Sequence, residues 1–295
     1  KTYTENQLFS PEISTTTGYS KLYVNAGKVT NKGIELALGF KQNIGPVDWK
    51  TTLLWSLNRN RIDQLLPEYT NEELGVTVHL DEMDVYSLGG AKQRLTVGGS
   101  MGDVYVNTMR TDEHGHIWMN SMTGTLETDK NNYVYAGNTN PKYTLSWRNE
   151  FNWKGISLGF MLNARVGGIG VSATQAVMDY YGVSKTSAEA RDNGGVKVNG
   201  QMIDAQTWYQ TIGANGTGYV GSMYVYSMTN VRLGELTLGY DIPINKWCKW
   251  ISGLNVSFVG RNLWMLYCKA PFDPESTAST GTYNQIGRAS CRERV

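Results

Sequence analysis

The stretch PKYTLSWRNEFNWKGISLGFMLNARV, from Pro141 to Val166, decides the fold of this chain. On each side of Lys154-Gly155, apolar and polar side chains alternate for about eleven residues, and Asn149 and Met161 are the two exceptions. This period of two predicts a pair of antiparallel strands, each with one apolar and one polar face. Lys154-Gly155 predicts a tight turn between them. The stretch is therefore predicted to form a β-hairpin.

Both arms of this hairpin are long, because strands of soluble proteins usually have about five or six residues. At about 3.3 Å per residue and about 40–45° of tilt, eleven residues span roughly the 25 Å apolar band of an outer-membrane barrel. The alternative is a hairpin in a two-layer sandwich. A sandwich would bury Trp147, Leu158 and Phe160, whereas a barrel would direct them to lipid and keep Arg148 and Arg165 inside.

A second stretch, from Gly33 to Asn58, alternates in the same way around a turn at Asn43–Pro46. Two further strands are expected within Val231–Pro243 and Leu254–Trp264. The apolar parity changes near Gly234, which indicates a β-bulge.

Two long stretches, about 59–140 and about 167–228, lose this alternation. We expect irregular loops there, with short strands around Gln93–Thr108 and Ile117–Asn120. Short turns that alternate with long loops are typical of barrels with short periplasmic turns and long outer loops.

The composition excludes several protein classes. Hydrophobic residues make up 40% of the chain, the mean hydropathy is −0.37, and no apolar run is long enough for a transmembrane helix. The net charge of +1 gives no sign of a nucleic-acid partner. The three cysteines, Cys248, Cys268 and Cys291, form neither a disulfide framework nor a metal-ligand spacing.

The two ends of the chain differ in character from the rest. No signal peptide precedes Lys1, so we expect the chain to be an internal fragment. Residues 286–295, IGRASCRERV, bring three arginines without alternation and resemble a translated sequencing adapter. The predicted organisation is a barrel segment over residues 1–285 and a non-native tail over residues 286–295.

Five sequence blocks, taken in order, resemble the C-terminal half of SusC/RagA-like TonB-dependent outer-membrane transporters. They are NAGKVTNKGIELAL (25–38), VGGSMGDVY (97–105), GNTNPKYTLSWRNEFNWKGISLGF (137–160), VRLGELTLGYDIP (231–243) and VGRNLWML…FDPE (259–275). The resemblance implies an all-β fold: an antiparallel transmembrane β-barrel of 22 strands, present here only as a partial, open curved sheet.

The same resemblance implies a location and partners. The family lies in the outer membrane of Gram-negative bacteria and imports oligosaccharides, or peptides in some members, into the periplasm. Its partners are a SusD-like surface lipoprotein, TonB and outer-membrane lipid. The plug, the TonB box and the final strand of the family have no counterpart in this sequence. An alternative that does not need the resemblance is a secreted all-β carbohydrate-active protein, a lectin-like module or a glycoside hydrolase.

Six residues are candidates for contact with substrate. Arg148, Glu150, Asn163 and Arg165 lie on the predicted polar face of the long hairpin, which a barrel turns toward its lumen. Trp208 and Tyr209 lie in the second long loop. Aromatic rings suit the apolar faces of sugars, and they equally suit a protein interface.

The sequence contains no convincing catalytic or metal-binding motif. Asp112–His116 offers two imidazoles without a third ligand at metal spacing, so we expect a hairpin tip there. A glycoside hydrolase would need two opposed carboxylates, and no distinctive pair is present. We therefore expect no enzymatic activity, no cofactor and no metal.

Overall fold

A computed structural model describes residues 1–9, 24–71, 76–120, 125–213, 218–243, 250 and 253–275. The chain divides into two compact units, each formed by separate parts of the sequence. Unit 1 contains residues 1–31, 60–140 and 169–226, and unit 2 contains residues 32–59, 141–168 and 227–295. The predicted tail, residues 286–295, lies outside the described residues.

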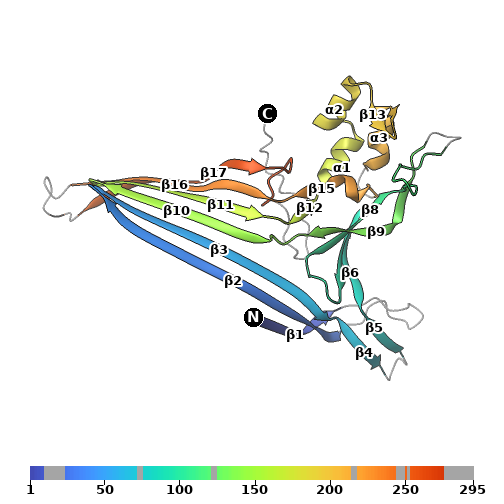
Figure 1. The fold of residues 1–295 in the computed structure, drawn as a ribbon, viewed down its shortest axis with the longest axis horizontal. Helices are drawn as coiled ribbons and strands as arrows, with labels where there is room; N and C mark the ends of the chain where they lie inside the picture. The colour runs from blue at the N-terminus through green and yellow to red at the C-terminus, as the bar shows by residue number, and fades with distance from the viewer. Residues whose placement is uncertain are drawn as a thin grey trace. The chain divides into compact units, whose positions relative to one another are not determined.

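The largest element is a seven-stranded sheet with the order β1-β2-β3-β10-β11-β16-β17 (Figure 1). Its strands are β1 (Thr2–Phe9), β2 (Val24–Ile44), β3 (Val47–Gln64), β10 (Tyr143–Trp153), β11 (Ile156–Val166), β16 (Asn230–Ile242) and β17 (Leu254–Cys268). The pairs with a defined register are antiparallel. The sheet has two edges, β1 and β17, so it is open. The predicted open antiparallel sheet is confirmed.

The predicted hairpin is formed by β10 and β11, whose pairing runs from Tyr143↔Val166 to Trp153↔Ile156. Between the strands, Lys154 has φ 49° and Gly155 has φ 87°. Two successive left-handed residues are the mark of a two-residue turn whose twist matches that of the strands. The turn between β2 and β3 is equally short, because β2 continues to Ile44 and only Gly45 and Pro46 remain.

Alternation gives unit 2 an apolar face and a polar face. The apolar face carries Trp147 and Leu158, 41% and 40% exposed, together with Leu238 at 54% and Phe258 at 68%. The polar face carries Arg148 and its neighbours. In a sandwich, the apolar side chains would be covered by a second sheet. Their exposure favours the barrel interpretation over the sandwich.

The polar exception on the apolar face, Asn149, is buried among aromatic rings and only 1% exposed. Trp49 donates a hydrogen bond from Nε1 to its Oδ1 over 3.2 Å. Trp49 stacks on Phe151 at 6.2 Å, and Phe151 stacks on Phe160 at 6.4 Å. The amide is therefore covered by rings and does not interrupt the apolar surface.

The predicted bulge is present at Gly234. Glu235 of β16 pairs with Met161 of β11, but Leu233 pairs with Leu162, so Gly234 has no partner in this register. The extra residue reverses the parity of the strand beyond this point. As a result Leu233 lies on the apolar face and Arg232, the partner of Asn163, lies on the polar face.

Residues 66–138 of unit 1 contain strands of five to eleven residues, so the expectation of irregular loops over about 59–140 is wrong for most of this stretch. One sheet has the order β6-β7-β8-β9, and β4 pairs with β5. Their bounds are β4 (Leu66–Asn71), β5 (Val76–Leu80), β6 (Glu82–Leu88), β7 (Ala91–Thr96), β8 (Asp103–Met109) and β9 (Thr128–Asn138). The strands expected within Gln93–Thr108 are confirmed as β7 and β8, and isolated bridges join Thr111 to Ile117 and Met119 to Leu126.

The expectation of an irregular loop over residues 167–228 is wrong. This segment contains α1 (Ala173–Tyr180), α2 (Lys185–Asp192), α3 (Ala205–Ile212) and a 3-10 helix, η2 (Gly221–Tyr224), with the short strands β12 (Ile169–Val171), β13 (Val196–Val198), β14 (Gln201–Ile203) and β15 (Val225–Ser227). We call residues 169–226 the helical insertion. None of the described helices has the length and apolar character needed to cross a membrane.

Side-chain caps start all three α-helices of the helical insertion. Ser172, Ser184 and Asp204 each accept a hydrogen bond from the backbone N–H three residues later. Such caps satisfy a donor that the first turn leaves unpaired, and each contributes about 1 kcal/mol. Helices of eight residues are too short to persist alone, so packing must stabilise them as well.

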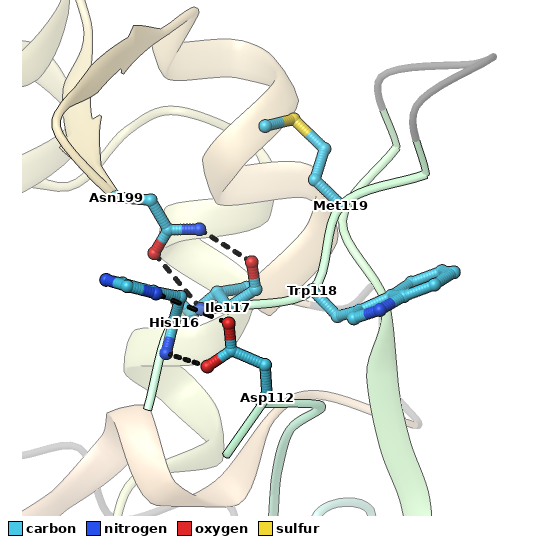
Figure 2. A pocket seen from close by; sticks show the side chains of 6 residues that line it. All are labelled: Asp112, His116, Ile117, Trp118, Met119 and Asn199. Carbon is cyan, nitrogen blue, oxygen red and sulfur yellow. Dashed lines mark hydrogen bonds and ion pairs between the residues drawn. The ribbon is translucent and has the colours of Figure 1, made fainter. Parts of the chain in front are cut away.

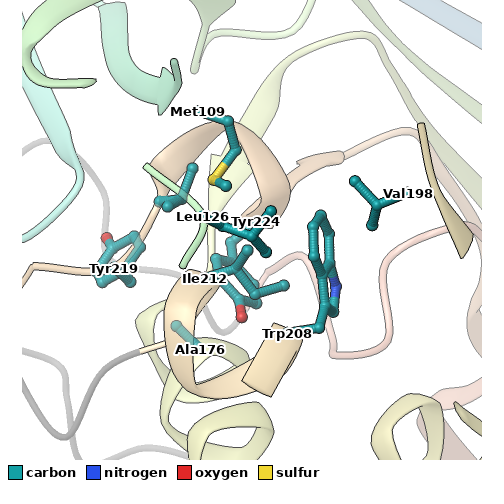
Figure 3. Close-up of a cluster of buried hydrophobic side chains, with 9 residues drawn as sticks. Met109, Leu126, Ala176, Val198, Trp208, Ile212, Tyr219 and Tyr224 are labelled. Atoms are coloured by element: carbon teal, nitrogen blue, oxygen red, sulfur yellow. The ribbon is translucent and has the colours of Figure 1, made fainter. Parts of the chain in front are cut away.

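The helical insertion shares a hydrophobic core with Met109, the last residue of β8, and with Leu126 (Figure 3). The core consists of Met109, Leu126, Ala176, Val198, Trp208, Ile212, Tyr219, Val220 and Tyr224. The backbone at Gly90, between β6 and β7, approaches the backbone of the helical insertion closely. A Cβ on Gly90 would lie 2.1 Å from the carbonyl oxygen of Tyr219. Only glycine permits this approach.

Candidate functional site

Five charged side chains form a row across the polar face of unit 2, which we call the charged row. Arg148 lies at its centre, with Nε 2.7 Å from Oε1 of Glu150 and Nη2 3.8 Å from Oε1 of Glu235. Lys50 is 3.9 Å from Glu150, and Arg261 is 3.6 Å from Glu235. The row crosses β3, β10, β16 and β17, and the guanidinium of Arg148 reaches past β11, which contributes no residue to the row.

Three cations and two carboxylates leave the charged row with one net positive charge. The side chains of Lys50, Arg148 and Arg261 are 59%, 52% and 77% exposed. Exposed ion pairs of this kind contribute only about 0–1 kcal/mol each to stability. The row is therefore mainly an electrostatic surface that presents cations to the solvent on this face.

Asn163 and Arg165 lie on the same face, nearer the end where the long connections join the sheet. Asn163 accepts a hydrogen bond on Oδ1 from the hydroxyl of Ser146 over 2.8 Å. Arg165 is half-buried between its strand partners Thr144 and Asn230. The structure thus places four of the six candidate residues, Arg148, Glu150, Asn163 and Arg165, on one face. Their contact with substrate stays a prediction.

The other two candidates belong to unit 1. Trp208 is 8% exposed and forms part of the core in Figure 3. Tyr209 is half-buried against the same core, and burial raises the pKa of its hydroxyl. This position favours a role in holding the helical insertion together. A direct contact of Trp208 or Tyr209 with substrate also stays a prediction.

A buried carboxylate, Asp179, organises the helical insertion and was not singled out from the sequence. It is 4% exposed and accepts hydrogen bonds from Gln175 Nε2 over 3.0 Å and Thr186 Oγ1 over 3.3 Å. Burial, followed by the charge of Asp179, raises the pKa of Tyr226 to about 12 and raises that of Tyr224 further. Asp179 therefore links α1 to the start of α2 and influences the tyrosines of η2 and β15.

The predicted hairpin tip at Asp112–His116 is confirmed. The Asp112 carboxylate accepts hydrogen bonds from the backbone N–H of His114 and His116 over 2.9 and 2.8 Å. These bonds, that from His116 first, lower the pKa of the Asp112 carboxyl. Among the described residues, no three His, Cys, Asp or Glu side chains come together as a metal site.

A cavity of about 330 Å³ lies beside this tip (Figure 2). It is lined by Asp112, His116, Ile117, Trp118, Met119 and Asn199. Asn199 binds both backbone groups of Ile117: it accepts from the N–H over 3.0 Å and donates to the carbonyl over 2.7 Å. The side chain thus replaces a neighbouring strand, and the polar groups of the cavity serve mainly to hold the tip in place.

Arg232 is the functional candidate that the sequence pattern does not single out. It is 5% exposed and forms ion pairs with Asp273 and Glu275, over 2.8 and 2.9 Å. The parity change at Gly234 was the available signal, because it moves Arg232 to the polar face. Its partners Asp273 and Glu275 lie beyond the end of β17. Alternation within a strand cannot predict contacts with residues outside it.

No protein-family model matches the chain. TonB-dependent receptor P3 of Formosa agariphila is 23% identical over 264 residues, which cover 81% of this chain and 24% of that protein. A chain of the RagAB peptide transporter superposes with a TM-score of 0.61 at 16% identity, covering 92% of this chain and 30% of that one. The RagAB peptide importer in its "closed-closed" state gives a TM-score of 0.59 at 17% identity, over 93% of this chain and 30% of that one.

The chain thus spans 24% of the length of its curated relative and 30% of each of these two solved chains. Its fold and its relatives indicate a location in the outer membrane of a Gram-negative bacterium. An exposed apolar face is suited to lipid and a polar face to the lumen of such a barrel. The chain has the fold of part of an outer-membrane TonB-dependent barrel, and the resemblance to SusC/RagA-like transporters that its sequence motifs indicated is confirmed.

Proposed function

We propose that this chain is part of a TonB-dependent transporter that imports oligosaccharides or peptides into the periplasm. The observation that carries the proposal is the two-faced sheet of unit 2. Its apolar face exposes large side chains such as Phe258, at 68%, while its polar face carries the charged row. A wall between lipid and an aqueous channel requires this division. The similarity to a TonB-dependent receptor and to the RagAB peptide transporter supports the same activity.

The proposed partners are TonB on the periplasmic side and a SusD-like lipoprotein on the outer side. In the helical insertion, Tyr181 and Val183 follow α1 and are 63% and 68% exposed. Aromatic and apolar side chains on an outer loop are typical of a protein interface. We therefore assign the lipoprotein contact to this part of unit 1.

The proposed protein is a transporter without enzymatic activity of its own. The proteins that resemble it are a receptor and a peptide transporter. On the polar face, the carboxylates Glu150 and Glu235 are engaged by Arg148. Their place in the charged row supports a role in solvating a passing substrate rather than in acid–base chemistry.

The test uses the complete gene in its native host. A deletion strain would be grown on oligosaccharides or on peptides as the sole nutrient, with and without the intact gene, and in a strain that lacks TonB. We expect growth on one of the two pools to require both the gene and TonB. The variant Arg148→Gln, which removes the centre of the charged row, should assemble normally and slow uptake. Equal growth of the deletion and complemented strains on both pools would refute the proposal.

A further inference from the structure

The chain folds back on itself after strand β17 and returns to the polar face of the sheet. Arg232 of β16 pairs with Met265 of β17, and Asp273, eight residues after Met265, contacts the guanidinium of Arg232. Asp273 and Glu275 bind separate nitrogens, Nη2 and Nη1, over 2.8 and 2.9 Å. We call residues 272–275 (Phe-Asp-Pro-Glu) the rim segment.

Several contacts brace the rim segment. Oδ1 of Asp273, which accepts from Arg232, also accepts from the backbone N–H of Glu275 over 3.0 Å. Pro274 is fully buried and fixes its own φ. Cys268 Sγ lies 3.7 Å from the carbonyl oxygen of Phe272 and donates toward it. The segment is therefore a rigid turn attached to the sheet at one cation.

The position of Arg232 places the rim segment at the outer end of the sheet. β16 begins at Asn230, directly after the helical insertion, whereas the short turns at Gly45-Pro46 and Lys154-Gly155 lie at the other end. Barrels keep their short turns on the periplasmic side. Because Arg232 lies on the polar face, its partners in the rim segment lie on the lumen side of the wall.

The ion pairs of Arg232 with the rim segment differ from those of the charged row in how deeply the cation is buried. Arg232 has a side chain that is 6% exposed, against 52% for Arg148. A buried cation that loses its carboxylates is left uncompensated, so breaking such a pair is costly, whereas an exposed pair is easily replaced by water. The buried cation, held by two carboxylates that are 39% and 47% exposed, thus keeps the rim segment in one position, and a constriction that selects by size requires such rigidity.

We propose that the rim segment forms a constriction at the outer mouth of the barrel, fixed by Arg232, which limits the size of the substrate that enters. The inference rests on the proposed transport function. Arg232 is in this view a positioning residue: it acts through Asp273 and Glu275, and the rim segment is the part that meets the substrate.

The test uses the full-length transporter in cells, in a background in which Cys268 is the only cysteine. The variants are Arg232→Gln and the pair Asp273→Asn with Glu275→Gln. A membrane-impermeant maleimide reports exposure of Cys268, which the rim segment contacts. Labelling should rise about tenfold or more, because each variant breaks the ion pairs of a buried cation and releases the rim segment from the sheet. Fluorescently labelled maltooligosaccharides and mixed peptides of graded length measure uptake, and the ratio of long to short substrates should rise.

Arg110→Gln is the matched control, because it removes a cation that is 55% exposed, 2.7 Å from the carboxylate of Glu127 and outside the charged row. It should change neither readout. If a variant fails to assemble, the same two readouts are measured on the triple variant Arg232→Met, Asp273→Asn and Glu275→Gln. This variant removes all three charges together, so it leaves no buried cation without a partner.

Two results would overturn the proposal. If Cys268 labelling stays at the wild-type rate in assembled variants, Arg232 does not hold the rim segment. If labelling rises while the ratio of long to short uptake is unchanged, the segment is not a constriction. A wild-type protein that takes up neither set of probes would instead refute the transport function, and the constriction with it.

Discussion

Leu53 and Leu54 offer the sharpest test of the two-faced wall, because they are adjacent residues of one type on opposite faces. Leu53 pairs with Trp147 on the apolar face, and Leu54 pairs with Ser146 on the polar face, where it is 48% exposed. Replacing each by Arg places the same charge at the same depth. Only Leu53→Arg directs that charge into lipid.

The expected cost follows from the position of Leu53 in β3. It lies six residues beyond Val47, which pairs with Trp153 beside the short turn. With about 3.3 Å per residue and about 40° of tilt, each residue advances about 2.5 Å across the membrane, which puts Leu53 about 15 Å into a band of about 25 Å. Near the middle of the band an arginine costs about 2–4 kcal/mol, or roughly 30- to 700-fold in the folding equilibrium. Leu54→Arg should cost much less, since its side chain stays in water.

The measurement is the folded fraction of the full-length transporter in lipid vesicles, followed by heat-modifiable mobility across a urea titration. Leu53→Met and Leu54→Met control for the change in side-chain shape. Only Leu53→Arg should shift the midpoint strongly. Equal losses for both arginine variants, or a greater loss for Leu54→Arg, would show that the assignment of the two faces is wrong.

Four further predictions concern the rest of the chain. Trp208→Ala should destabilise the helical insertion by about 3–5 kcal/mol and open it to limited proteolysis, while the barrel still assembles. Burial raises the pKa of Tyr226 to about 12 from an unfolded value of about 10. The helical insertion should therefore be fully stable below about pH 10 and weaken as the pH rises toward 12, and Tyr226→Phe should reduce this loss in a proteolysis series. Tyr181→Ala with Val183→Ser should weaken recovery of the lipoprotein in a pull-down without changing assembly. Removing residues 286–295 should leave the melting temperature unchanged, and a clear loss would show that they belong to the fold.

The sheet could be predicted from the sequence because its physical cause is local. Lipid on one side and water on the other impose a period of two, so the bounds of β10 and β11, Tyr143–Trp153 and Ile156–Val166, follow from the alternation. Gly234 was predictable for the same reason, as the point where the parity changes.

The helical insertion could not be predicted by the same argument. Each of its helices spans only two turns, which is too short for a clear period of 3.6 residues, and their stability comes from the shared core. The caps Ser172, Ser184 and Asp204 were readable signals, but such residues are common in loops as well. Trp208 illustrates the limit: its residue type suggested a binding surface, whereas its burial depends on contacts with segments distant in the sequence.

The candidate site was predictable only in part. The alternation along each strand identified the face that carries Arg148, Glu150, Asn163 and Arg165. Assigning a residue to a face in this way requires no knowledge of the neighbouring strands. The charged row depends on the pairing of β10 with β3 and of β11 with β16. Glu235 reaches Arg148 from a strand that is distant in the sequence, and no local pattern contains that information.

The bulge at Gly234 makes strand β16 sensitive to length rather than to side-chain identity. Replacing Gly234 by alanine would require mainly Asn163 to move, since its Nδ2 lies 2.3 Å from the position of the new Cβ. Loss of any one codon between those of Arg232 and Glu235 would instead return the strand to a single parity and turn Arg232 toward lipid. In a mutational scan of the gene, this site should therefore tolerate many missense changes and reject in-frame deletions of one residue.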